Sequence, residues 1–397
     1  AGNVTYTVVP YTEAGKGETS SVSVYVGVNT PRAPSGVTAV ETDTEGTVNV
    51  TWQAPSVSAD DFPMDPSLIS YNLYSVAGGK KELVASGIKG TSYTHKAIEA
   101  GGSQQFMQYG VMGVTEKGEG PGAVSSLVAV GTSYKMPFKE SFAYGSPSHI
   151  FGTEIVNGTS PEVIYWQQCT SGDINKYMAS DDDNGFIAHY AKYAGQGGRL
   201  FTGKIKVEAE HPVLWLSTYS ITADDKNILD VEVREPGGEW KKVNTSVVND
   251  LSENQKAWGR LVIDLSEYKG KTVQLGFSFT TKSFAWSLLD DLRLYDAKGN
   301  DLALVTMAAP LVTPSGTSYA VECKVENAGS KESGSYTVNA SLNGEKVATA
   351  DGTTLLPGKN RMATLVFDIP VNAADINTLK VTVDNAGDEN AADNSRE

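Results

Sequence analysis

Two carboxylates in strand-like segments are the strongest candidates for chemistry in this sequence. Glu140 alternates with Phe138 and Phe142, and Asp290 alternates with leucines at positions 288, 292 and 294. Because successive side chains of a strand point to opposite faces, each carboxylate is expected to share a face with large apolar side chains. A buried carboxylate without a partner costs several kcal/mol. Each one therefore needs a cation, a set of N–H donors or a proton.

A shared Ca²⁺ site would meet this need. Calcium binds about six to eight oxygen ligands and tolerates irregular loops. The sequence therefore predicts a calcium site of Glu140 and Asp290, helped by loop oxygens of Asp181, Asp183 or Asn184. Two alternatives stay open: the carboxylates accept hydrogen bonds from turns or face solvent at strand ends, and the acidic loop is simply solvated. The loop lacks the spacing of an EF-hand.

Aromatic residues offer a second kind of site, since their faces stack on sugar rings. Trp166 lies in a less regular stretch, with Tyr177, Tyr190 and Tyr193 nearby in the sequence. This group is the candidate glycan platform, and the alternative is that its rings are structural. Three further tryptophans lie in apolar strands and are predicted to belong to the core: Trp52, Trp215 and Trp286.

The sequence favours a protein without catalytic activity. It contains no G-x-S-x-G elbow, no H-E-x-x-H pair and no phosphate-binding glycine loop. A Ser-His-Asp set can be assembled on paper from His189 or His211, as in any chain of this length. Paired carboxylates for glycoside hydrolysis are defined in space, so spacing does not exclude them.

Length and composition limit the other function classes. At roughly 150 residues per domain, 397 residues indicate two or three domains. The net charge of −15 disfavours nucleic-acid and membrane-surface partners, and no apolar run is long enough for membrane insertion. Cys169 and Cys323 lack C-x-x-C spacing and are predicted to be buried free thiols. The oligomeric state stays open.

Short alternating segments bounded by Gly, Pro, Asn or Asp predict an all-β chain of tandem β-sandwiches. Residues 6–18 also parallel residues 109–121, each a strand followed by a glycine-rich turn and a second strand. The second copy follows a long series of strands, whereas little precedes the first. Residues 1–30 are therefore expected to be a partial fibronectin-like hairpin that packs on a neighbour, pairs with another chain or results from truncation.

Residues 31–133 resemble a fibronectin type III domain. The resemblance rests on Pro31, Pro34, Trp52, the segment 71–74 and the closing hairpin at 109–130. Val48, Val50 and Trp52 are expected to share one face, where the tryptophan fills the space between two sheets.

Residues 134–297 resemble the jelly rolls of the MAM and cleaved-adhesin (gingipain adhesin) type, through segments 138–142, 181–185 and 288–292. This resemblance implies that the first and last strands lie side by side, and that such domains carry structural calcium. Residues 298–397 resemble a CARDB-like Ig-fold module, through segments 319–329 and 355–358 and the acidic tail 388–394.

These resemblances imply a bacterial, secreted or cell-surface adhesion protein without catalytic activity. It is expected to bind an extracellular protein or glycan through loops of the jelly roll. Two other functions stay open: an accessory C-terminal region of a larger secreted peptidase or glycosidase, and a spacer without a ligand. Fold alone does not identify the ligand.

Overall fold

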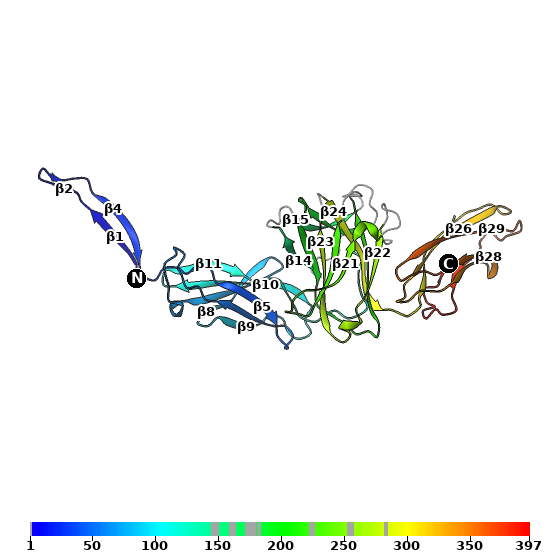
Figure 1. Cartoon of the computed structure of the whole chain (residues 1–397), viewed down its shortest axis with the longest axis horizontal. Helices are drawn as coiled ribbons and strands as arrows, with labels where there is room; N and C mark the ends of the chain where they lie inside the picture. The colour runs from blue at the N-terminus through cyan, green and yellow to red at the C-terminus, as the bar shows by residue number, and fades with distance from the viewer. Residues whose placement is uncertain are drawn as a thin grey trace.

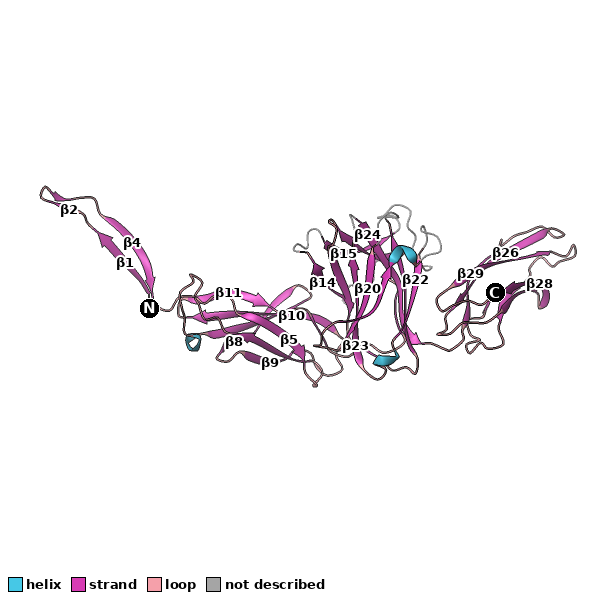
Figure 2. Cartoon of the chain, viewed as in Figure 1, coloured by secondary structure: helices cyan, strands magenta, loops and turns pink. Residues whose placement is uncertain are grey.

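The computed structural model is all-β and arranges its sheets as a row of sandwiches along one long axis (Figures 1 and 2). It describes residues 2–143, 151–158, 164–170, 180, 184–221, 227–251, 258–281 and 285–397. Single-turn 3-10 helices occur at Pro66–Leu68, Val248–Asp250 and Ser266–Tyr268. Within these residues, no helix is long and apolar enough to span a bilayer. The tandem sandwiches predicted from the sequence are confirmed.

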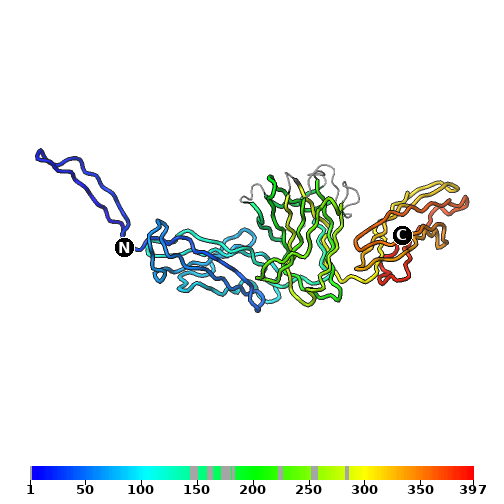
Figure 3. Tube along the Cα trace, viewed as in Figure 1, coloured from blue at the N-terminus to red at the C-terminus, as the bar shows by residue number. Residues whose placement is uncertain are grey.

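The N-terminal segment is a lone antiparallel hairpin. Strand β1 (Gly2–Val8) pairs with β4 (Ser20–Val26), and the tip carries β2 (Tyr11–Thr12) and β3 (Gly15–Lys16). Val4 lies opposite Val24 and Tyr6 opposite Val22, so the apolar side chains share one face, and all four are exposed. The hairpin projects away from the first sandwich (Figure 3).

The first sandwich has a three-stranded and a five-stranded sheet. The smaller sheet has the order β5-β6-β9, with strands Ser35–Glu41, Thr47–Gln53 and Ser92–Lys96. The larger has the order β11-β10-β7-β8, with β12 also paired to β10; its strands are Gly118–Val124, Gln105–Thr115, Ser70–Ala77, Lys80–Ile88 and Val128–Val130. Trp52 is buried between the sheets, 5.2 Å from the ring of Tyr71 in edge contact. The predicted core position of Trp52 is confirmed.

The central sandwich packs two six-stranded sheets around one large core. One sheet has the order β15-β16-β24-β19-β22, with β13 also on β24; its strands are Ile164–Thr170, Gly185–Ala191, Ala285–Asp296, Pro212–Ser220, Gly259–Asp264 and Phe138–Glu140. The other has the order β14-β17-β23-β20-β21, with β18 on β23; its strands are Phe151–Asn157, Gly197–Thr202, Thr272–Thr280, Ile228–Arg234, Lys241–Val247 and Ile205–Lys206. The first strand β13 pairs with the last strand β24, as expected.

A β-bulge in β24 changes which residues share a face. Ser217 of β19 lies opposite Asp290, but Trp215 lies opposite Arg293, so β24 has one extra residue there. Asp291 adopts a left-handed φ of 48°. Such a bulge interrupts strand alternation. Leu289, Leu292 and Leu294 consequently belong to the core between the sheets, whereas Leu288 packs in a separate cluster. The predicted common face of residues 288, 292 and 294 is wrong for this reason.

The C-terminal sandwich has a three-stranded and a four-stranded sheet. The first has the order β25-β26-β29, with strands Leu302–Ala308, Ser318–Asn327 and Asn360–Asp368. The second has the order β28-β27-β30-β31, with strands Glu345–Gly352, Tyr336–Leu342, Leu379–Asp384 and Ser395–Arg396. Cys323 lies in this core, and Cys169 is buried in the central sandwich; both are free thiols, as predicted. The module limits 1–30, 31–133, 134–297 and 298–397 stay a prediction.

A buried ion pair joins the first sandwich to the central sandwich, which is the unit that resembles a jelly roll and is called the jelly roll below. The Lys204 ammonium contacts the Glu41 carboxylate, and each side chain is almost entirely buried. The side chain of Gln104 accepts a hydrogen bond from the Lys204 N–H and donates one to its carbonyl at 3.1 Å. Beside this contact, Phe106 and Phe201 meet edge to face at 5.4 Å. The two sandwiches are thus fixed to one another by buried polar and aromatic contacts.

Replacing Lys204 with Met should destabilise the chain by about 3 kcal/mol, because it leaves the Glu41 carboxylate buried without its cation. Lys242→Met is the matched control. The Lys242 side chain is 53% exposed and lies 2.7 Å from the Asp230 carboxylate, and an ion pair near the surface contributes about 0–1 kcal/mol. Urea unfolding monitored by tryptophan fluorescence measures both. Equal, small losses for the two variants would contradict a structural role for the buried pair.

Candidate functional site

The predicted calcium ligands Glu140 and Asp290 are both buried on neighbouring strands. Glu140 ends β13 and lies opposite Leu292, two positions from Asp290 on β24. Glu140 Oε1 accepts the N–H of Phe142 at 2.6 Å. Asp290 accepts the N–H groups of Ser180 and Asp291. Backbone donors therefore reach both carboxylates, which is one of the alternatives predicted for them.

The predicted loop ligands are only partly described. Asp181 and Asp183 lie outside the described residues, and Asn184 is exposed just before β16. Among the residues that the structure describes, no group of three or more His, Cys, Asp or Glu side chains is arranged to hold a metal. The calcium site of Glu140, Asp290 and the loop stays a prediction.

Asp291 is a buried carboxylate that sequence reasoning missed. Arg293 donates to it through two nitrogens at 2.7 and 2.8 Å, and Arg260 donates at 3.0 Å. Arg260 also lies 3.8 Å from the buried carboxylate of Glu326 in the C-terminal sandwich. Asp291 therefore holds Arg260 and Arg293 in place, and Arg260 reaches from the jelly roll to the C-terminal sandwich. The sequence signal was the Asp290-Asp291 doublet, whose second member occupies the bulge.

The aromatic residues of the predicted glycan platform lie on two different faces. Trp166 lies opposite His189, and its ring packs 5.0 Å from His189 and 5.6 Å from Phe279 on the core side. Tyr190 points to the other face of the sheet. Tyr193 is exposed in the turn after β16, and Tyr177 lies outside the described residues.

Tyr190 meets two rings that sequence reasoning had not grouped with it. It stacks on Tyr165 with ring centroids 4.9 Å apart, and lies 5.0 Å from Trp286. Tyr165 and Trp286 are 6.1 Å apart, edge to face. All three are half-buried on the outer face of β15, β16 and β24. Trp286, predicted to belong to the core, packs partly buried against the smaller core cluster that contains Leu288 and not in the core between the two sheets. We call Tyr165, Tyr190 and Trp286 the outer aromatic cluster.

His189 is unsuited to act as a base at neutral pH. It is fully buried, and its Nε2 accepts the N–H of Gly198 at 3.0 Å, which requires an unprotonated nitrogen. Burial lowers the pKa of His189 to about 3. This histidine is therefore a neutral core residue that supports Trp166.

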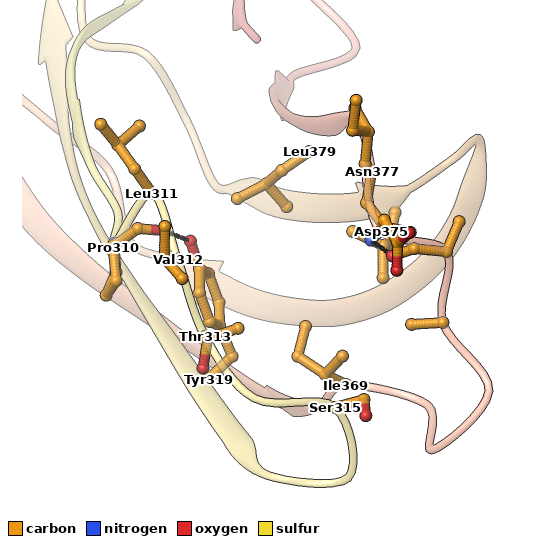
Figure 4. A pocket seen from close by; sticks show the side chains of 14 residues that line it. Pro310, Leu311, Val312, Thr313, Ser315, Tyr319, Ile369, Asp375, Asn377 and Leu379 are labelled. Carbon is orange, nitrogen blue, oxygen red and sulfur yellow. Dashed lines mark hydrogen bonds between the residues drawn. The ribbon is translucent and has the colours of Figure 1, made fainter.

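A hollow of about 470 Å³ lies at the far end of the C-terminal sandwich, between residues 310–315 and 373–377 (Figure 4). The Tyr319 hydroxyl donates to the carbonyl of Pro310 across one side. Leu311 and Ile376 are exposed here, and Asp375 is its one ionisable side chain apart from the tyrosine. The described residues that line this hollow include no acid–base pair.

Burial of His189 in its neutral form should make the free energy of unfolding depend on pH. The unfolded chain binds a proton at this residue near pH 6.5, whereas the folded chain does not, so stability should fall as the pH decreases from 6.5 to 5, by up to about 1.4 kcal/mol per pH unit. His189→Gln should reduce this slope, and His211→Gln, at an exposed position, should retain it. Urea unfolding at several pH values measures the slope. An identical slope in parent and His189→Gln would contradict this account.

Comparison with known proteins identifies the C-terminal module most firmly. Residues 299–395 match the CARDB family, which confirms the resemblance of that segment. No curated protein matches the chain.

Three solved structures have the module types that the sequence resembles. The K1 cleaved adhesin domain of Lys-gingipain from Porphyromonas gingivalis W83 is 14% identical over 41% of this chain and 98% of that one, with a TM-score of 0.32. A Fn3-like protein from Clostridium thermocellum is 25% identical over 25% and 94%, with a TM-score of 0.19. A CARDB domain from Pyrococcus furiosus, in complex with di-metal ions, is 20% identical over 25% and 84%, with a TM-score of 0.22. The chain is similar to a Fn3-like protein, a cleaved adhesin domain and a CARDB domain, the module types that the sequence resembles.

Proposed function

We propose that this chain is a non-catalytic adhesion protein, secreted or displayed on the cell surface, that binds a glycan through its jelly roll. The outer aromatic cluster carries the proposal: three rings converge, half-buried, on one face of a sheet. The binding surface would be this sheet face together with the loops beside it.

The geometry of the cluster suits a sugar ring. Aromatic faces provide a large contact area at a low cost in conformational entropy, because few torsions need to be fixed. Strand pairing fixes the backbone of Tyr165, Tyr190 and Trp286, since β16 pairs with both β15 and β24. Gln167, two residues after Tyr165 on the same face, is exposed and can donate to and accept from sugar hydroxyls. A neutral polyol fits this combination better than a charged partner does.

A glycan array probed with the whole chain tests the proposal, followed by calorimetry with the best glycan. Trp286→Ala and Tyr190→Ala should each weaken binding at least about tenfold, as expected when a central aromatic contact is removed. Tyr11→Ala is the matched control, because Tyr11 is 75% exposed in the distant hairpin; its affinity should equal the parent's. The proposal is contradicted if no glycan binds at millimolar concentration, or if all variants bind the glycan with equal affinity. In that event a protein ligand becomes the stronger candidate.

We further propose that Glu140 and Asp290 bind a structural Ca²⁺ ion. Two buried carboxylates on adjacent strands support this assignment. Each carboxylate oxygen has lone pairs for more than one partner, so a backbone N–H donor and a cation can share one carboxylate. A cation bound here would tie the first strand of the jelly roll to its last.

Chelation tests this calcium site. EDTA should lower the melting temperature of the parent jelly roll, and Asp290→Ala should abolish the difference between chelator and calcium. Asp264→Ala, an exposed carboxylate in the same sandwich, should retain it. An unchanged melting curve in chelator, together with no metal by elemental analysis, would end the proposal.

A further inference from the structure

Two carboxylates of the C-terminal sandwich have buried oxygens without a partner. Asp301 precedes β25 and is only 5% exposed, and Asp393 precedes β31. The Oδ1 atom of each is buried and accepts no hydrogen bond from the residues that the structure describes. Two neighbouring amide oxygens, of Asn300 and Asn394, are buried and unpaired in the same way. Buried acceptor oxygens without a donor among the described residues therefore occur at two pairs of consecutive residues, 300–301 and 393–394.

The two carboxylates are held close together. The Asn390 amide donates to Asp301 Oδ2 at 3.3 Å and to Asp393 Oδ2 at 3.0 Å. Because one nitrogen serves both, the two Oδ2 atoms lie no farther apart than the sum of these distances. Asp388 fixes the loop by accepting the N–H groups of Leu302 and Asn390, both at 2.8 Å.

The residues that the structure describes supply no cation to this pair. Within the described part of the chain, neither Asp301 nor Asp393 forms an ion pair, whereas the buried Asp291 is contacted by Arg260 and Arg293. Burial and the charge of Asp393 raise the pKa of Asp301 to about 6. Two carboxylates this close and this buried oppose each other's ionisation unless a positive charge lies between them.

We propose that Asp301 and Asp393 bind a divalent cation, Ca²⁺, independently of the site at Glu140 and Asp290. The donor set is entirely oxygen and lies on irregular loops, which suits calcium; Mg²⁺ instead demands near-octahedral geometry. Asp393 is half-buried, so water can reach the ion and complete its coordination.

The bound ion would clamp the module at its junction with the jelly roll. It links the segment that enters β25 to the acidic loop before the last strand, where the Asp393 carbonyl already accepts the N–H of Leu304 at 2.9 Å. Tyr295 of β24 lies beside it: its hydroxyl donates to the Ala328 carbonyl at 2.8 Å, and burial followed by the charge of Asp301 raises its pKa. Binding should therefore stabilise both the module and its attachment.

Calorimetric titration of the whole chain with CaCl₂, after chelation and dialysis, tests the proposal. Asp301→Asn and Asp393→Asn should each bind one fewer ion per chain than the parent. Asp351→Asn, at an exposed carboxylate of β28 in the same sandwich, should bind the parental number. Asp290→Ala should retain this ion, so the two calcium proposals succeed or fail separately. Circular dichroism establishes that each variant is folded.

Equal numbers of bound ions in the parent and Asp301→Asn would overturn the proposal. A second pair of results would also overturn it: calcium leaves the melting temperature of the parent unchanged, and Asp301→Asn is more stable than the parent in chelator. The two carboxylates would then share a proton instead of a metal. If Asp301→Asn does not fold, Asp393→Asn decides the question, since it alters the more exposed member of the pair.

Discussion

A charge buried inside a β-sandwich must have a counter-charge or a set of donors, and this requirement shapes the two joints between the sandwiches. Lys204 and Glu41 satisfy one another where the first sandwich meets the jelly roll. Asp291 and Glu326 share Arg260 where the jelly roll meets the C-terminal module. Removing either partner would leave an uncompensated charge in a low-dielectric interior, which costs far more than an exposed pair contributes. The pairs therefore fix how neighbouring sandwiches are placed.

The two faces of one sheet of the jelly roll differ: one closes the core, and the other carries the aromatic rings proposed to bind a glycan. The core side of the jelly roll is closed by Trp166, the neutral His189 and Phe279. Its outer face presents half-buried rings on strands that cannot shift independently, because β24 is paired on both sides. If this face binds a glycan as proposed, its place on a rigid sheet between two fixed joints suits adhesion, since a pull on the chain is transmitted through the strands to the contact.

The sequence predicted the architecture better than the sites. Alternation and turn residues indicated the sandwiches, and Trp52 was predicted to be buried because its strand also contains Val48 and Val50. Alternation failed at Asp290 and Asp291, where the bulge inserts a residue that no periodic rule includes. It also could not place Tyr165 beside Tyr190, because that contact depends on the register between β15 and β16. The ion pair of Glu41 with Lys204 joins distant positions in the sequence, so only the folded chain reveals it.

Native mass spectrometry of the whole chain in calcium-containing buffer tests the central claim most directly, because it counts the ions held by one folded molecule. If both proposed calcium sites are occupied, the principal species should carry two calcium ions and lose both after chelation. A principal species with the mass of the bare polypeptide, at calcium concentrations typical of extracellular fluid, would contradict the account.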